Sequence, residues 1–213
     1  MRVLLTAFEP YAEWSTNSSW LALAELLRHR PPSVDLVTRR YPVDLVRLEH
    51  ALAKDLQQPL DAVLHLGQAP GTPVIRLETL AINAGGSVAE NGHDVTRLVE
   101  GAPEAYRTRM PLARWAQLLR SKNVPVEVSY HAGTYLCNAI MYLSHHWMAQ
   151  RSSTIPIGFV HLPLTTEQSA QSGRSLPSLP VETLAASVAT ILDDLQTGCV
   201  VEMKSAAPHT ERV

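Results

Sequence analysis

One of the two cysteines of this chain stands where a nucleophile would be expected. Cys137 lies in the segment SYHAGTYLCNAIMYL (129–143), after a strand-like run and a Gly-Thr turn and at the start of a helix-like run. A helix N-terminus stabilises a thiolate through its dipole and free backbone N–H groups, and the same groups can bind an oxyanion. The position indicates a reactive thiol. The alternative is a small hydrophobic core residue, which is what most lone cysteines are.

Two further side chains could activate such a thiol. His161 lies near the end of the apolar run GFVHLP, 24 residues after Cys137. We expect its strand, 155–163, to neighbour the strand at 124–130, so that imidazole and thiol meet where both strands end. Glu78 lies in the strand-like run RLETLAIN and could orient the imidazole as the third member of a Cys–His–acid set. The alternatives are a satisfied core histidine for His161 and an exposed edge residue for Glu78.

Other sequence patterns give no support to metal or nucleotide chemistry. The chain has no CxxC, HExxH, Walker or GxGxxG pattern. His145 and His146 are adjacent on a helix-like run, which is not the spacing of metal ligands on a helix. We therefore expect no cofactor.

The elements that must position these side chains alternate between strand and helix. Short apolar runs predict strands at 2–8, 34–41, 61–68, 74–83, 124–130 and 155–163. Helical periodicity and capping residues predict helices at 17–29, 43–56, 111–122, 137–149 and 180–196. Between them we expect a long polar loop at 84–110, and at the end a frayed tail at 201–213. This alternation predicts an α/β fold with a largely parallel sheet and helices on both faces.

Composition narrows the class of protein. The chain has 213 residues, of which 46% are hydrophobic and 18% charged, and its formal net charge is −2. These values are typical of a globular domain and give no indication of nucleic-acid or membrane partners. Two cysteines do not form a disulfide framework, so we expect a cytoplasmic protein.

Taken together, the motifs resemble a known family. AGTYLCN around Cys137, GFVHLP…EQ around His161 and LETLAIN around Glu78 are similar to segments of the pyroglutamyl peptidases, also called pyrrolidone-carboxylate peptidases. The similarity extends to LLTAFEPY, NSSW, LHLGQAPG and GAPEAYRTRMPL and runs from residue 2 to about residue 195. The resemblance implies a three-layer α/β/α sandwich with a largely parallel, mixed twisted sheet. We expect one catalytic domain, 1–213.

The same resemblance implies an activity, the removal of N-terminal pyroglutamate from peptides. Cys137 would attack the pyroglutamyl carbonyl, His161 would take the thiol proton and return it to the leaving amine, and Glu78 would hold the imidazole. An acyl-enzyme would form and be hydrolysed without a metal or cofactor. The family assembles as homodimers or homotetramers. The alternative is a catalytically silent relative that binds N-terminally blocked peptides.

A neutral lactam needs an apolar pocket with one or two polar groups. By resemblance, its walls and polar contacts are expected from Phe8, Tyr11, Tyr135 and Leu136, and from Asn17 and Gln68. For Phe8, core packing is an equally good interpretation.

The chain departs from the family pattern at two places. The usual TGFEPFGG is here TAFEPYAE, and the stretch after AIN is AGGSVAEN where the family has ARIPDN. The family arginine near the oxyanion is therefore missing close to Ser87. We expect the loop 84–93 to be poorly ordered without ligand and to close over the substrate.

Overall fold

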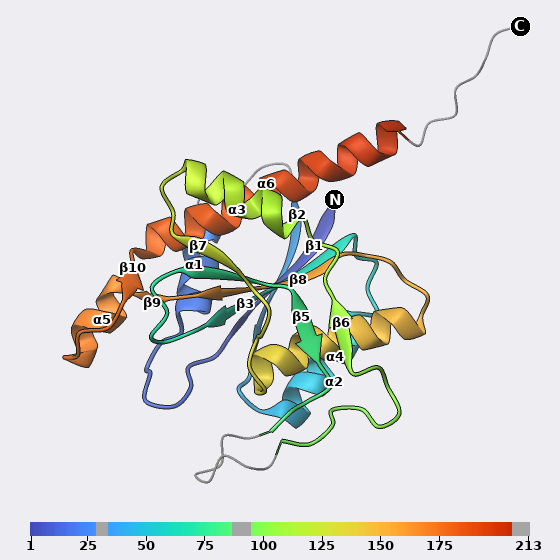
Figure 1. The fold of residues 1–213 in the computed structure, drawn as a ribbon, viewed down its shortest axis with the longest axis horizontal. Helices are drawn as coiled ribbons and strands as arrows, with labels where there is room; N and C mark the ends of the chain where they lie inside the picture. Colours follow the sequence, from blue (N-terminus) through green and yellow to red (C-terminus); the bar gives the residue numbers. More distant parts are fainter. Residues whose placement is uncertain (29–33, 87–94, 206–213) are drawn as a thin grey trace, which may run out of the picture.

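The computed structural model describes residues 1–28, 34–86 and 95–205, and its centre is a six-stranded sheet with helices on both faces (Figure 1). The sheet has the strand order β2-β1-β3-β8-β4-β7. Its strands are β1 (Arg2–Phe8), β2 (Asp35–Tyr41), β3 (Ala62–Gln68), β4 (Ile75–Glu78), β7 (Val126–Ser129) and β8 (Ile157–Leu162). This confirms the expected three-layer α/β/α fold.

Alternating side chains along the strands divide the apolar core into two parts. On one face, Val3 and Leu5 of β1 belong to the cluster that packs against α1 (Ser18–Arg28), α3 (Leu112–Ser121) and α6 (Val181–Ser205). On the other face, Leu4 belongs to the cluster that packs against α2 (Leu45–Asp55) and α4 (Leu136–Gln150). In Figure 1, α3 and α6 lie above the sheet and α2 and α4 below it. Successive residues of a strand point to opposite faces, so both sides of the buried strands must be apolar.

The strand order corrects one expectation. The strand that leads to Cys137, β7, does not neighbour β8, because β4 lies between them. β4 runs parallel to β7 but antiparallel to β8, while the other pairings of the sheet are parallel. The expectation was wrong because local hydrophobic patterns carry no information about strand order. The strand β4 places Glu78 between β7 and β8.

The run predicted as one strand at 74–83 is two strands in different sheets. β4 ends at Glu78, and β5 (Leu80–Ile82) pairs with β6 (Ala105–Arg107) in a separate antiparallel ribbon. β6 lies inside the segment expected to be one long loop. At the start of that loop, Gly85 pairs with Thr96, and the Gly86 N–H donates to the Thr134 carbonyl.

The C-terminal part differs from expectation in two elements. A short helix, α5 (Thr166–Ser172), was not predicted, although Thr165 and Gln168 form a complete capping box at its start. α6 continues to Ser205, five residues into the segment expected to be frayed, since TGCVVEMKS contains no proline and a single glycine costs a helix only about 1 kcal/mol. A small parallel pair, β9 (Leu164–Thr165) and β10 (Ser178–Leu179), joins these two helices.

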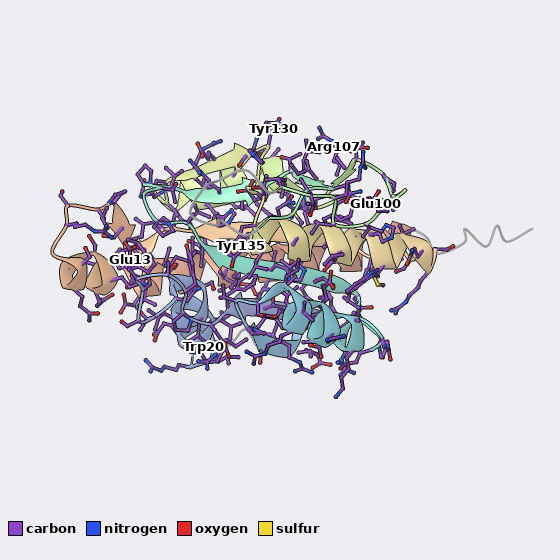
Figure 2. The ribbon with its side chains drawn as sticks, turned by 90° about the horizontal axis from the view of Figure 1, so that it is seen from below. Glu13, Trp20, Glu100, Arg107, Tyr130 and Tyr135 are labelled. Atoms are coloured by element: carbon purple, nitrogen blue, oxygen red, sulfur yellow. The ribbon has the colours of Figure 1, made fainter. Side chains whose placement is uncertain are left out.

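Side chains at the two ends of the β7–α4 connection lie apart. Figure 2 shows Tyr135 near the middle of the molecule and Tyr130 at its periphery.

None of the helices in the described part of the chain combines the length and the apolar character needed to cross a membrane.

Candidate active site

Cys137 lies in the first turn of α4, as predicted, and is half-buried. The residue before the helix, Tyr135, has an extended backbone, and its side chain makes no capping hydrogen bond. The first N–H groups of a helix have no partner within the helix. A negative charge on or near the Cys137 sulfur would therefore be stabilised by the start of α4.

The space beside the sulfur exists because residue 67 is glycine. A Cβ on Gly67 would lie 3.0 Å from Cys137 Sγ and 2.6 Å from Cζ of Phe159. Gly67 is also the register partner of His161 between β3 and β8. A glycine inside an apolar strand often marks such a close approach, and this signal was present in LHLGQ.

His161 and Glu78 form a hydrogen bond of 2.8 Å between Nδ1 and Oε1. The strand register explains why they meet. β4 and β8 are antiparallel, with His161 opposite Arg76 and Phe159 opposite Glu78, so His161 and Glu78 are diagonal neighbours within reach of a long side chain. Glu78 is fully buried, which excludes the alternative of an exposed edge residue.

The charges around this pair determine its titration. Burial opposes the charged imidazole, but the negative charge of Cys137, hydrogen bonding to it, and Glu78 together raise the pKa of His161 to about 9. For Glu78, burial opposes ionisation, but the hydrogen bond and charge of His161, helped by Ser129 and Arg76, lower the pKa of the carboxyl. The arrangement therefore favours the charged form of His161 at neutral pH.

Cys137 and His161 open into a cavity of about 260 Å³. All six residues expected to bind substrate line it together with them: Phe8, Tyr11, Asn17, Gln68, Tyr135 and Leu136. Phe8 also belongs to the buried cluster under α2 and α4, so packing and lining are compatible for this residue. Glu78 is not part of the lining, because it lies behind His161.

Hydrogen bonds within the protein fix the orientation of the Gln68 side chain. Its Oε1 accepts hydrogen bonds from the Ser18 N–H (2.6 Å) and from Nε2 of Gln168 (2.7 Å), and Gln168 also donates to the Thr16 carbonyl. Nε2 of Gln68 is buried and has no partner in the described chain. A buried donor of this kind is costly unless a ligand or water satisfies it.

Asn17 and Tyr11 contribute in other ways. The Asn17 amide is engaged within the protein, since Oδ1 accepts from Ser19 and Nδ2 donates to the Glu9 carbonyl. Tyr11 donates a long hydrogen bond of 3.4 Å to the Gln68 carbonyl. Burial and the negative charge of Cys137 raise the pKa of Tyr11 to about 12, so its hydroxyl stays neutral and able to donate.

Asn138 is a further residue that sequence reasoning missed. It is fully buried beside Cys137, and its side chain makes three hydrogen bonds to the backbone of Ile82 and Ala84. It thus joins the start of α4 to the end of β5, where the 84–93 segment begins. The signal available was a polar residue inside an apolar helix-like run, which needs partners when buried.

Two remaining expectations concern metals and the 84–93 loop. The described residues contain no group of three or more His, Cys, Asp or Glu side chains arranged to hold a metal. Ala84, Gly85 and Gly86, at the start of this segment, each make backbone hydrogen bonds. The rest of the segment, with Ser87, lies outside the described residues.

A thiol at a helix start, an imidazole and a buried carboxylate on an α/β/α sandwich form the arrangement of a cysteine hydrolase. Comparison with known proteins supports the same class of protein. The family model for pyroglutamyl peptidase matches residues 1–195. The chain is 33% identical over 200 residues to a pyrrolidone-carboxylate peptidase of Thermococcus onnurineus, covering 90% of this chain and 97% of that protein. A pyrrolidone-carboxylate peptidase of Pectobacterium atrosepticum is 33% identical over 201 residues, covering 91% and 92%.

Solved structures agree with this. The crystal structure of a pyrrolidone carboxyl peptidase from Fervidobacterium islandicum has a TM-score of 0.86 and 34% identity, covering 92% of this chain and 99% of that one. A mutant pyrrolidone carboxyl peptidase from Pyrococcus furiosus has a TM-score of 0.82 and 29% identity, covering 91% and 97%. The chain belongs to the pyroglutamyl peptidase family.

Proposed function

We propose that this chain removes N-terminal pyroglutamate from peptides, with Cys137 as nucleophile, His161 as general base and acid, and Glu78 as the group that orients His161. The observation that carries the proposal is that Cys137 and His161 open into one largely apolar cavity, while His161 is hydrogen-bonded to Glu78 behind it. Membership of the family supports the substrate class.

The reaction follows from the charges of the site. Because the pKa of His161 is raised to about 9, the imidazole holds a proton at neutral pH and can stabilise a thiolate on Cys137 beside it. The thiolate attacks the pyroglutamyl carbonyl, and the oxyanion that forms faces the N–H groups at the start of α4. The imidazolium then protonates the leaving amine. In the second half, neutral His161 takes a proton from water, which hydrolyses the thioester and releases pyroglutamate.

Substrate choice follows from the lining of the cavity. Phe8, Tyr11, Tyr135 and Leu136 provide apolar walls, and the unpartnered Nε2 of Gln68 provides a donor for the lactam carbonyl. No carboxylate is among the described lining residues that could compensate an ammonium group. An open-chain glutamyl or glutaminyl residue brings such a charge, and burying it without a partner costs several kcal/mol.

The test is the hydrolysis of pyroglutamyl-coumarylamide by purified protein, with glutamyl- and glutaminyl-coumarylamide as competitors for the same pocket and Cys137→Ala as control. We expect kcat/KM to be at least about a hundredfold higher for the pyroglutamyl substrate, and no turnover by Cys137→Ala. Equal kcat/KM for the three substrates would contradict the assigned pocket. Tight binding of a pyroglutamyl peptide without hydrolysis would instead support the silent relative.

The chain is further proposed to act as one catalytic domain in the cytoplasm, as a homodimer or homotetramer. A free thiol at Cys137 supports a reducing compartment, and the resemblance to the family supports the assembly. Light scattering coupled to size-exclusion chromatography tests the assembly directly, and a monomeric mass would contradict it.

A further inference from the structure

Half of the Glu78 carboxylate has no hydrogen bond. Oε1 is bonded to His161, but Oε2 is buried and has no hydrogen-bond partner in the described part of the chain. A buried carboxylate with one free oxygen can rotate away from its partner, and leaving that oxygen unsatisfied is costly. The strand on the far side of Glu78 from His161 is β7, so a second partner is to be sought there.

The register between β4 and β7 places one hydroxyl beside that oxygen. The strands are parallel, with Arg76 opposite Glu127 and Glu78 opposite Ser129. Arg76 and Glu127 touch, with 2.6 Å between Nε and Oε1, so side chains of register partners meet on this face of the pair. Residues two positions further along each strand lie on the same face, which puts Ser129 next to Glu78.

Ser129 also has a proton to donate. Its Oγ accepts a hydrogen bond of 3.3 Å from the His131 N–H, and a hydroxyl can accept and donate at the same time. Hydrogen bonding to Ser129 is one of the influences that lower the pKa of Glu78, although the hydroxyl lies outside normal hydrogen-bond geometry to Oε2.

We propose that Ser129 is a positioning residue that donates a hydrogen bond to Oε2 of Glu78 and so fixes the carboxylate against His161. The inference rests on the proposed function, because it gives Ser129 a task in orienting the general base. It also connects the site to the 130–135 segment, since the His131 N–H donates to Ser129 and this segment leads into α4. Glu78 would then be held from both sides, by an imidazole on β8 and a hydroxyl on β7.

The other charged groups that act on Glu78 are accounted for. His161 lies on β8, Cys137 on α4 acts through His161, and Arg76 on β4 itself is paired with Glu127 on β7. None of them donates to Oε2. Ser129 is therefore the neutral group whose removal changes the carboxylate without removing a charge.

The test compares Ser129→Ala with Ser129→Thr, which keeps the hydroxyl, in the full chain. For Ser129→Ala we expect kcat to fall about three- to tenfold with KM within about twofold, and the acid limb of kcat/KM to move up by about half a pH unit. Ser129→Thr should restore both. In a Glu78→Gln background, Ser129→Ala should cause no further loss, because the group it acts through is gone.

Three results would overturn the proposal. These are an unchanged kcat and acid limb in Ser129→Ala, failure of Ser129→Thr to restore them, or an equal loss from Ser129→Ala in the Glu78→Gln background. The pH dependence of Cys137 alkylation by iodoacetamide reports the same acid limb without turnover. If the wild-type protein does not hydrolyse pyroglutamyl-coumarylamide, the proposed function fails, while alkylation still shows whether Ser129 acts on the pair.

Discussion

His65 on β3 and His161 on β8 lie on paired strands and close to one ring, that of Phe159, yet their pKa values are shifted in opposite directions. The Phe159 ring centroid is 6.3 Å from that of His65 and 4.7 Å from that of His161. Burial, with a small contribution from His145, lowers the pKa of His65 to about 3. The pKa of His161 is raised to about 9 even though burial acts on it in the same direction.

The difference lies in the partners of the two rings. His65 is bonded to two neutral hydroxyls, Thr6 at 2.7 Å and Ser144 at 2.9 Å. His161 is bonded to the Glu78 carboxylate and acts on Cys137, and two negative groups outweigh the desolvation of the imidazolium. A buried histidine with neutral partners therefore stays uncharged and has a structural role. A histidine that is equally buried but has negatively charged partners can hold and transfer a proton.

The largest effect is expected from replacing each of the two histidines by glutamine. His161→Gln should lower kcat by at least about a thousandfold, as removal of a triad member does in other hydrolases. His65→Gln should keep kcat within about tenfold and should mainly lower the free energy of unfolding, by about 1–3 kcal/mol, through its altered bonds to Thr6 and Ser144. Both are measured with pyroglutamyl-coumarylamide and by urea unfolding. A comparable loss of kcat in both variants would remove the functional distinction.

Gly67 gives the next effect, because it lies between the two environments. A methyl group there meets the Phe159 ring at 2.6 Å and the Cys137 sulfur at 3.0 Å, so ring or sulfur must shift. Since a displacement of about 1 Å can cost a hundredfold in rate, we expect Gly67→Ala to lower kcat by about that factor.

Gly158→Ala is the matched control for this variant. A methyl group at Gly158 meets Met110 at 2.8 Å, on a contact that involves neither Cys137 nor His161. It should lower stability by about 1–3 kcal/mol, as overpacking does, with little change in kcat at a temperature where both variants are folded. Equal activity of the two variants would show that Gly67 is needed for packing only.

The local features of the site could be predicted from the sequence. Cys137 at a helix start and His161 at a strand end follow from hydrophobic periodicity and capping patterns within about ten residues. The way they meet could not be predicted, because β4 enters the sheet antiparallel between β8 and β7 and carries Glu78 with it. That arrangement depends on contacts between distant segments.

The two histidines show the same limit. LHLG around His65 and VHLP around His161 are nearly the same local pattern, with a single histidine in an apolar run. Thr6, 59 residues from His65, and Glu78, 83 residues from His161, decide between the two outcomes. Before the fold was known, His161 was distinguished by its place at a strand end 24 residues after Cys137 and by the resemblance to a family.

The pH dependence of the free energy of unfolding gives a further test of the difference between His65 and His161. His65 stays neutral in the folded protein but takes up a proton near pH 6.5 when unfolded, so its contribution to stability is present above pH 6.5 and is lost as the pH falls toward 3. One such group lowers the free energy of unfolding by about 2 kcal/mol between pH 7 and pH 5. His65→Gln should lose about 2 kcal/mol less than the wild type over this range in urea unfolding. The pKa of His145 is also lowered, but this residue is present in both the wild type and the variant, so its contribution cancels. An identical loss of free energy of unfolding in the two proteins would show that His65 does not titrate as stated.

The smallest effect concerns the alkaline limb of the pH–rate profile. Because the pKa of His161 is raised to about 9, its charge supports activity at neutral pH, and kcat/KM should fall as the pH rises through about 9. Glu78→Gln removes one of the two negative partners, so the pKa of His161 drops and the limb should move down by about one pH unit, while the Cys137 charge keeps it above that of His65. Glu127→Gln is the matched control, since it removes an exposed carboxylate from the same face and should move the limb by less than about 0.3 units. Rates of pyroglutamyl-coumarylamide hydrolysis and of iodoacetamide alkylation between pH 5 and 10 measure the limb in two ways. An alkaline limb that stays in place in Glu78→Gln, or that moves equally in both variants, would mean that the carboxylate behind His161 does not set its charge.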